Sequence, residues 1–169
     1  MPTPSKELVA LHKHWCIADS IKQVVLAPLP EISRQTTTKR LPDDLAAFAE
    51  SHSRFMRLQI WYALLYVVIE GYRALDHKSV EVEKLLSNEE MVNALRLFRN
   101  AVFHYQKDPL TEKLLVFLDA KESEIWIWHL NSALKKHLEF LLPIESWFNT
   151  VAVPVYRRPW WRFWGSGNE

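Results

Sequence analysis

The side chains with the clearest chemical potential lie in the segment Arg99-Asn100-Ala101-Val102-Phe103-His104. This segment places a permanent cation, an amide and an imidazole within about one and a half turns of an expected helix. A guanidinium binds phosphate as a planar fork and keeps its proton, whereas an imidazole gives or takes a proton near neutral pH. Such a combination suits the cleavage of RNA phosphodiester bonds, and little else in the chain indicates a catalytic site.

A helix that begins after Ser87 is expected to position these side chains. Ser87 followed by Glu90 is the pattern of a capping box, and Asp108-Pro109 ends the helix because the residue before a proline avoids helical geometry. The apolar residues at helical spacing predict the buried face of this helix, which consists of Met91, Ala94, Leu95, Phe98, Ala101 and Val102.

The polar residues of the same helix form one edge. Arg96, Asn100 and His104 follow one another at intervals of four residues, so they share a face of the helix. The long side chain of Arg99 reaches the same edge. The alternative is that both arginines are solvated and that His104 is an ordinary surface histidine.

The rest of the chain predicts further helices around this one. Ser5 caps a first helix that Pro28 ends, and a long helix begins at Asp43 or Asp44 and continues to about residue 75. An apolar stripe that includes Leu45 and Phe48 predicts the buried face of the long helix, and Gly71 within it predicts a close approach of another helix. A short helix over 110–118 and a last helix over 123–142 follow.

The predicted fold class is all-α, an antiparallel bundle of four to five helices with short connections. Only 3 glycines occur in the 169 residues, which disfavours hairpins and glycine-rich phosphate loops. Residues 1–150 are expected to form a single bundle domain, in which 81–84 is a charged connector. Residues 151–169 form a Trp/Arg-rich C-terminal tail.

Arg99-Asn100 followed by His104 on the third expected long helix resembles the signature of HEPN-domain proteins. That signature is Arg, then four to six residues, then His, often with a polar residue after the Arg. The resemblance covers residues 42–142 and implies a HEPN-like bundle. Many HEPN proteins are metal-independent endoribonucleases of toxin–antitoxin and phage-defence systems, and they dimerise so that two motif helices line one cleft. Others lack nuclease activity and bind a protein or nucleotide partner.

The resemblance implies that Arg99 and His104 are catalytic, that the chain is a homodimer, and that RNA and an antitoxin protein are its partners. It requires no metal and no cofactor. The residues expected to bind the substrate are Asn100, Arg96 and Tyr105. Glu70 interrupts an apolar face of the long helix and could pair with Arg99 or orient His104, although such a residue is more often a rim or ion-pair residue.

Composition limits the remaining functions. The net charge of +1 gives no global nucleic-acid signal, so any RNA binding must be local. The single cysteine, Cys16, excludes an internal disulfide and a multi-cysteine zinc site. The first residues do not read as a signal peptide, and the longest apolar run, Ile60 to Ile69, is too short for a bilayer span. The expected location is the cytoplasm.

The tail segment 156–164 interleaves arginines with aromatic residues. Aromatic faces stack on unpaired bases while arginines bind phosphates, which suits a nucleic-acid arm. The same composition suits a membrane surface, and simple packing on the bundle or on a second subunit is a further alternative. The sequence thus predicts a HEPN-like ribonuclease, with a non-catalytic HEPN-like interaction module, or an adaptor that acts through the tail, as alternatives.

Overall fold

The computed structural model describes residues 4–29, 35–36, 39–40 and 42–142, and helices make up nearly all of the regular structure in these ranges. Its helices are α1 (Lys6–Val24), α2 (Asp43–Arg73), α3 (Val80–Leu86), α4 (Glu89–Phe103), α5 (Glu112–Leu118) and α6 (Ser123–Leu141). The two-residue strands β1 (Gln35–Thr36) and β2 (Lys39–Arg40) pair antiparallel between α1 and α2. The predicted all-α class is confirmed, and the Trp/Arg-rich tail lies outside the described residues.

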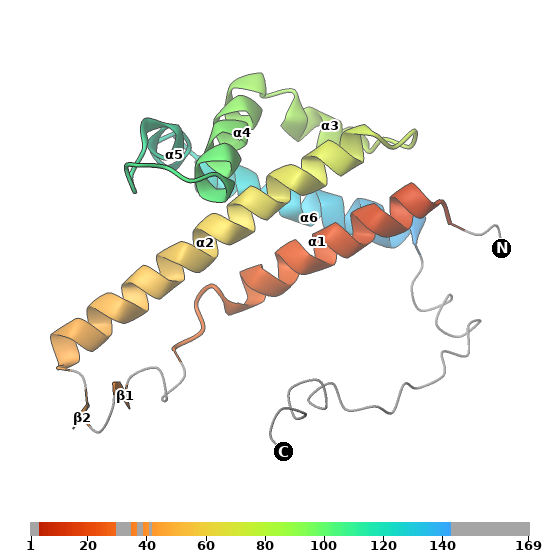
Figure 1. Ribbon diagram of the computed structural model, residues 1–169. Helices are drawn as coiled ribbons and strands as arrows, with labels where there is room; N and C mark the ends of the chain where they lie inside the picture. The colour runs from red at the N-terminus through yellow and green to blue at the C-terminus, as the bar shows by residue number, and fades with distance from the viewer. Residues whose placement is uncertain (1–3, 30–34, 37–38, 41, 143–169) are drawn as a thin grey trace, which may run out of the picture.

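The long helix α2 organises the molecule. Figure 1 shows α1 lying along α2 in the opposite direction, with α3, α4 and α5 on the other side and α6 behind. Ser5 caps α1 as predicted, because its Oγ accepts a hydrogen bond from the Leu8 amide at 3.2 Å. A Cβ atom added to Gly71 would lie 2.9 Å from Cδ1 of Leu11 on α1, which confirms the predicted close approach.

An aromatic cluster fixes α4 against α2 and α5. The ring centroids of Phe98 on α4 and Phe117 on α5 are 5.5 Å apart, and Tyr62 on α2 lies within 5.9 Å of both. All three side chains are buried, so their contacts set the position of the helix that carries the candidate site. The predicted buried face of α4 is confirmed, except that Val102 is only half-buried.

The structure corrects the predicted start of this helix. Asn88 caps α4, because its Oδ1 accepts from the Met91 amide at 3.1 Å. Ser87 instead ends α3, and its Oγ donates to the Lys84 carbonyl at 2.8 Å. The segment interpreted as a charged connector, 81–84, is therefore part of the helix α3, which the burial of Val82 and Leu86 stabilises. The described residues contain six helices rather than four or five for this reason.

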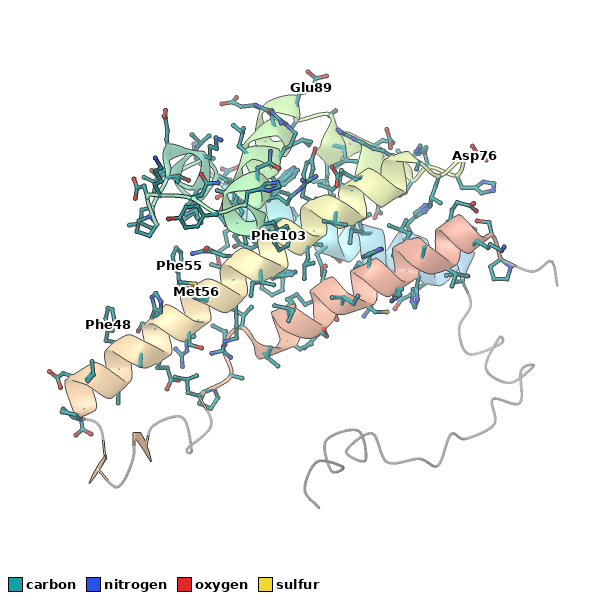
Figure 2. All side chains as sticks on the ribbon, in the orientation of Figure 1. Phe48, Phe55, Met56, Asp76, Glu89 and Phe103 are labelled. Atoms are coloured by element: carbon teal, nitrogen blue, oxygen red, sulfur yellow. The ribbon has the colours of Figure 1, made fainter. Side chains whose placement is uncertain are left out.

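The predicted buried stripe of α2 is wrong in its first half. Leu45 and Phe48 are exposed, because this half of α2 extends beyond α4, α5 and α6. Figure 2 labels Phe48 near this end of α2. Asp43 also starts the helix without a cap, since Pro42 holds the N-cap position and no side chain caps it. None of the helices in the described ranges is long and apolar enough to cross a membrane.

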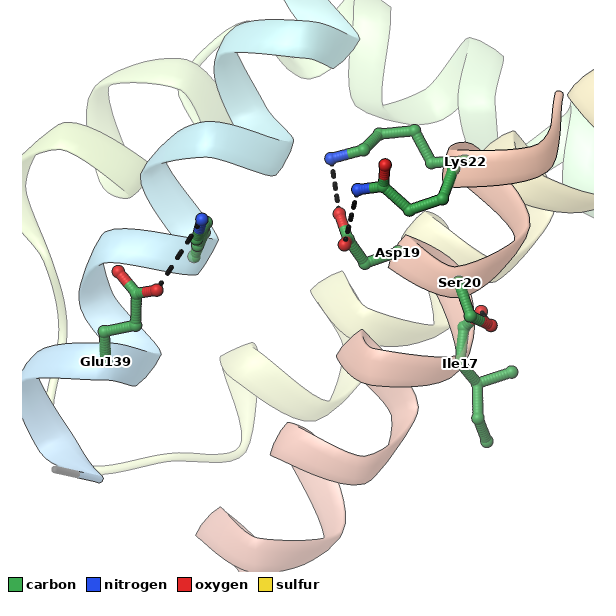
Figure 3. A network of polar contacts seen from close by, with 7 residues as sticks. Ile17, Asp19, Ser20, Lys22 and Glu139 are labelled. Atoms are coloured by element: carbon green, nitrogen blue, oxygen red, sulfur yellow. Dashed lines mark hydrogen bonds and ion pairs between the residues drawn. The ribbon is translucent and has the colours of Figure 1, made fainter. Parts of the chain in front are cut away.

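The surfaces of α1 and α6 carry local polar contacts, which Figure 3 shows. On α1, the Asp19 carboxylate pairs with Lys22 and accepts a hydrogen bond from Gln23 at 3.1 Å. On α6, Lys135 and Glu139 lie 3.7 Å apart. Each contact joins residues of one helix, so these pairs stabilise single helices and do not determine how the helices pack.

Candidate functional site

The candidate site lies where α4 ends. The last helical residue is Phe103, and His104 takes an extended conformation with φ −116° and ψ 142°. The prediction that Asp108-Pro109 ends the helix is therefore wrong. His104 lies one residue beyond the helix, although its amide still donates to the Asn100 carbonyl at 3.2 Å. The chain turns at this point because α5 must return to bury Leu114 and Phe117 in the core.

The guanidinium of Arg99 is held from three sides. Its Nη2 pairs with the Glu70 carboxylate on α2, and its Nη1 donates to Asn100 Oδ1 at 3.0 Å. Its Cζ lies 5.1 Å from the centre of the Tyr66 ring, the range of a cation–π contact. Glu70 thus makes one of its two predicted contacts, the one with Arg99. The Arg99 side chain is 23% exposed and that of Glu70 47%, so solvent reaches the pair.

His104 has a different environment. Its side chain is exposed and lines a cavity of about 340 Å³ between α2, the end of α4 and the start of α5. The walls are Met56 and Gln59 of α2, residues 101–106, and Asp108, Pro109, Thr111 and Leu114. Figure 2 labels Met56 and Phe103 on this side of α2. Arg99 does not line the cavity, so the structure does not bring the two predicted catalytic side chains into one hollow.

The three residues predicted to bind substrate are distributed around these two environments. Asn100 is engaged by Arg99 through its side-chain oxygen. Arg96 is exposed, and its Nε and Nη2 donate to Asn93 Oδ1 at 3.1 and 2.9 Å. Tyr105 is 91% exposed and belongs to the cavity wall. Of the three, Tyr105 alone lies beside His104 in the cavity.

Sequence reasoning missed Tyr66 and Gln59, both on α2. Tyr66 precedes Glu70 by four residues and Gln59 precedes Tyr66 by seven, so all three share one face of the helix. A signal was present, because Gln59 is an amide within an otherwise apolar or aromatic run from Leu58 to Ile69. A polar side chain at such a position needs a partner or a function.

Two other titratable groups lie on α1, away from α4. Cys16 Sγ is 3.7 Å from His12 Nε2. Burial lowers the pKa of His12, whereas burial and the charge of Asp19 raise the pKa of the Cys16 thiol. A thiol with a raised pKa is a poor nucleophile. Within the described ranges, no group of three or more His, Cys, Asp or Glu side chains could hold a metal ion.

No family model, curated protein or solved structure matches the chain. Its chemistry therefore has to follow from the geometry of α2 and α4. A guanidinium fixed by a carboxylate, an amide and an aromatic ring can bind an anion in one orientation. An exposed imidazole at the edge of a hollow can exchange a proton with a bound molecule.

Proposed function

We propose that this chain is a HEPN-like endoribonuclease that cleaves single-stranded RNA without a metal ion. The observation that carries the proposal is the pair of environments at the end of α4. Arg99 is oriented there by Glu70, Asn100 and Tyr66, and His104 is exposed beside a cavity. These are the two groups that phosphodiester cleavage through the RNA 2′-hydroxyl requires.

The proposed reaction uses the substrate's own nucleophile. Neutral His104 accepts the proton of the 2′-hydroxyl while the 2′-oxygen attacks the adjacent phosphorus. The bond from phosphorus to the 5′-oxygen breaks, and that oxygen takes up a proton from water or from a second, protonated imidazole. The products are a 2′,3′-cyclic phosphate and a 5′-hydroxyl, so no serine or cysteine of the protein reacts.

Arg99 stabilises the negative charge that develops on the phosphate oxygens. Its Nη2 pairs with Glu70 in the free protein, so the phosphate must share or replace that carboxylate. Exposure of the pair makes this exchange feasible, because solvent screens the attraction between the two side chains. Asn100 stays on Nη1 and keeps the plane of the guanidinium fixed.

We further propose that the active form is a homodimer, in which a second copy supplies a second Arg99 and His104. The exposed row Leu45, Phe48, Met56 and Ile60 on α2 supports this proposal. An apolar row of this kind favours burial against a protein surface, and Met56 also lines the cavity beside His104. In a toxin–antitoxin system, an antitoxin protein is the partner that restrains the enzyme.

The test is incubation of the purified protein with a single-stranded RNA in EDTA, followed by analysis of the product ends. We expect cleavage that leaves 2′,3′-cyclic phosphate and 5′-hydroxyl ends. A copy of the same RNA with 2′-O-methyl groups throughout should stay intact, because its nucleophile is blocked. Intact RNA in both samples, with the dimer confirmed by light scattering and no antitoxin present, would contradict the proposal.

The alternative function is a non-catalytic HEPN-like module that binds a protein partner. The contacts of Arg99 Nη2 with Glu70 and of Nη1 with Asn100 favour this alternative, since a guanidinium already paired with a carboxylate can serve the fold alone. The exposed apolar row on α2 would then be the binding surface for the partner. Failure of RNA cleavage together with a stable dimer would select this function.

A further inference from the structure

The cavity beside His104 contains an amide that has no hydrogen-bond partner among the described residues. Gln59 projects from α2 into the cavity wall and is only 9% exposed. Among the described residues, no hydrogen bond reaches its side chain. An amide offers one acceptor and two donors. Neither amide atom of Gln59 belongs to the fully buried polar atoms without a partner, so a molecule bound in the cavity can reach both.

A second unpaired polar group lies in the same cavity. Thr111 occupies the N-cap position of α5, yet its hydroxyl caps no amide of that helix. Its Oγ1 is buried and has no hydrogen-bond partner in the described part of the chain. Gln59 and Thr111 come from segments far apart in the sequence and both line this cavity.

The other walls indicate an uncharged, flat ligand. The aromatic side chains Phe103 and Tyr105 and the apolar side chains Met56 and Leu114 provide stacking and apolar contacts. Asp108 is the charged residue in the wall besides the titratable His104, and no lysine or arginine lines the described cavity. A phosphate would be repelled by that carboxylate, whereas a neutral ring with polar edges would be accepted.

We propose that this cavity binds one unpaired nucleobase of the RNA substrate, with Gln59 and Thr111 hydrogen-bonded to the edge of the base. The inference rests on the proposed function for its substrate class. The cavity volume of about 340 Å³ is at the small end of the usual range for ligand pockets, about 300 to 1,000 Å³. A base that stacks on an exposed aromatic side chain and pairs with an amide is the usual mode of single-stranded RNA recognition.

The position of the cavity agrees with a phosphate at Arg99. Gln59 and Tyr66, whose ring lies under Arg99, are separated by seven residues on α2, about 10 Å along the helix axis. One nucleotide can span this distance from its phosphate to the far edge of its base. His104 lies at the cavity edge, so a base bound there would bring its own ribose close to the imidazole.

The experiment is an NMR titration of the intact protein with each of the four nucleoside 5′-monophosphates. Gln59→Met keeps the size of the side chain and removes the amide, and Gln23→Met is the matched control on α1. We expect at least one nucleotide to bind with shifts confined to the cavity residues and to Arg99, where its phosphate would lie. Its affinity should fall about tenfold in Gln59→Met, the loss of a good hydrogen-bonded pair, and should be unchanged in Gln23→Met.

Thr111→Val separates binding from folding. Removing an unpaired buried hydroxyl should leave the melting temperature unchanged or raise it, while the affinity for the bound nucleotide falls several-fold. A purely structural role of Thr111 predicts no change in affinity. Binding of none of the four nucleotides, or equal binding by wild type and Gln59→Met, would overturn the proposal.

The outcomes also distinguish this inference from the proposed function. If the wild-type protein binds a nucleotide through Gln59 but leaves RNA intact, the base-binding cavity is supported and the proposed ribonuclease activity is contradicted. If the wild-type protein cleaves RNA, and Gln59→Met keeps the same rate and the same base preference, the ribonuclease activity is supported and the base-binding cavity is contradicted.

Discussion

The surroundings of Arg99 and His104 differ in how many polar groups already have partners. Arg99 is paired with Glu70, bonded to Asn100 and stacked on Tyr66. Five residues later, His104 is exposed at a cavity whose Thr111 hydroxyl has no partner among the described residues. The difference indicates that three contacts orient the Arg99 guanidinium before any substrate binds, although its Nε is buried without a partner in the described structure, whereas the proposed substrate would have to orient itself at His104.

The largest expected effect on the rate of RNA cleavage comes from Arg99→Ala, which removes the oriented guanidinium. We expect the rate of RNA cleavage to fall at least about a hundredfold, the usual scale for the loss of a transition-state charge partner. Arg99→Lys should recover little of this rate, because a point charge cannot pair with Glu70 and Asn100 as a fork does. Single-turnover cleavage assays measure both.

Arg54→Ala is the matched control for that substitution. Arg54 also pairs with a carboxylate, that of Glu50 at 2.8 Å, but it lies on α2 and its side chain is 45% exposed. Its removal should change the cleavage rate by less than about threefold, as for most exposed side chains away from a reacting centre. Equal losses in the two variants would mean that general positive charge, not the fixed guanidinium, supports cleavage.

A smaller effect on the cleavage rate is expected when Arg99 is kept and the Glu70 carboxylate that pairs with it is removed. Glu70→Ala leaves the guanidinium without its carboxylate, so cleavage should slow by about tenfold as its orientation becomes less defined. The stability cost should stay below about 1 kcal/mol, because exposed ion pairs contribute little. Chemical denaturation and single-turnover kinetics check the two parts, and an unchanged rate would show that Glu70 does not position Arg99.

The smallest effect concerns a histidine that is built into the fold, in contrast to His104. His137 on α6 is buried against Tyr72, and its Nε2 lies 3.2 Å from the His77 carbonyl. Burial lowers the pKa of His137, and the charges of His77 and Lys78 lower it further, while the hydrogen bond to the carbonyl opposes them. In the folded protein this imidazole therefore stays neutral at a pH where the unfolded chain already binds a proton.

The sign of the pH dependence follows from this difference. The contribution of His137 to stability is complete above about pH 6.5 and is lost as the pH falls below it. We expect the decrease in melting temperature between about pH 7.5 and 5.5 to be smaller by a few °C in His137→Gln. His129→Gln, at an exposed position of the same helix, should leave the decrease as in wild type. Scanning calorimetry at both pH values measures it.

Local patterns in the sequence predicted much of the fold. The 3.6-residue spacing of apolar residues predicted the buried face of α4, and Ser5 and Gly71 predicted a helix cap and a close helix contact. The contact between Glu70 and Arg99 was one of two alternatives, because Glu70 interrupts an apolar face of α2. The signal for each of these predictions lies within one or two helical turns, although the contacts of Gly71 and Glu70 reach another helix.

Features that depend on distant segments could not be predicted. The short helix α3 is stabilised by burial of Val82 and Leu86 in the core, so its sequence alone read as a charged connector. Phe48 has the spacing of a core residue, but none of the helices in the described ranges covers that part of α2. The cavity joins residues 56–59 to residues 101–114, and only the packing of α4 and α5 on α2 brings them together.

The most direct test of the proposed ribonuclease compares two single substitutions in the same metal-free cleavage assay. His104→Ala removes the imidazole at the cavity, and His129→Ala removes another exposed imidazole, on α6. We expect the His104 variant to leave single-stranded RNA intact in EDTA while the His129 variant cleaves it at the wild-type rate. Cleavage by the His104→Ala protein at the wild-type rate would contradict a catalytic role of His104.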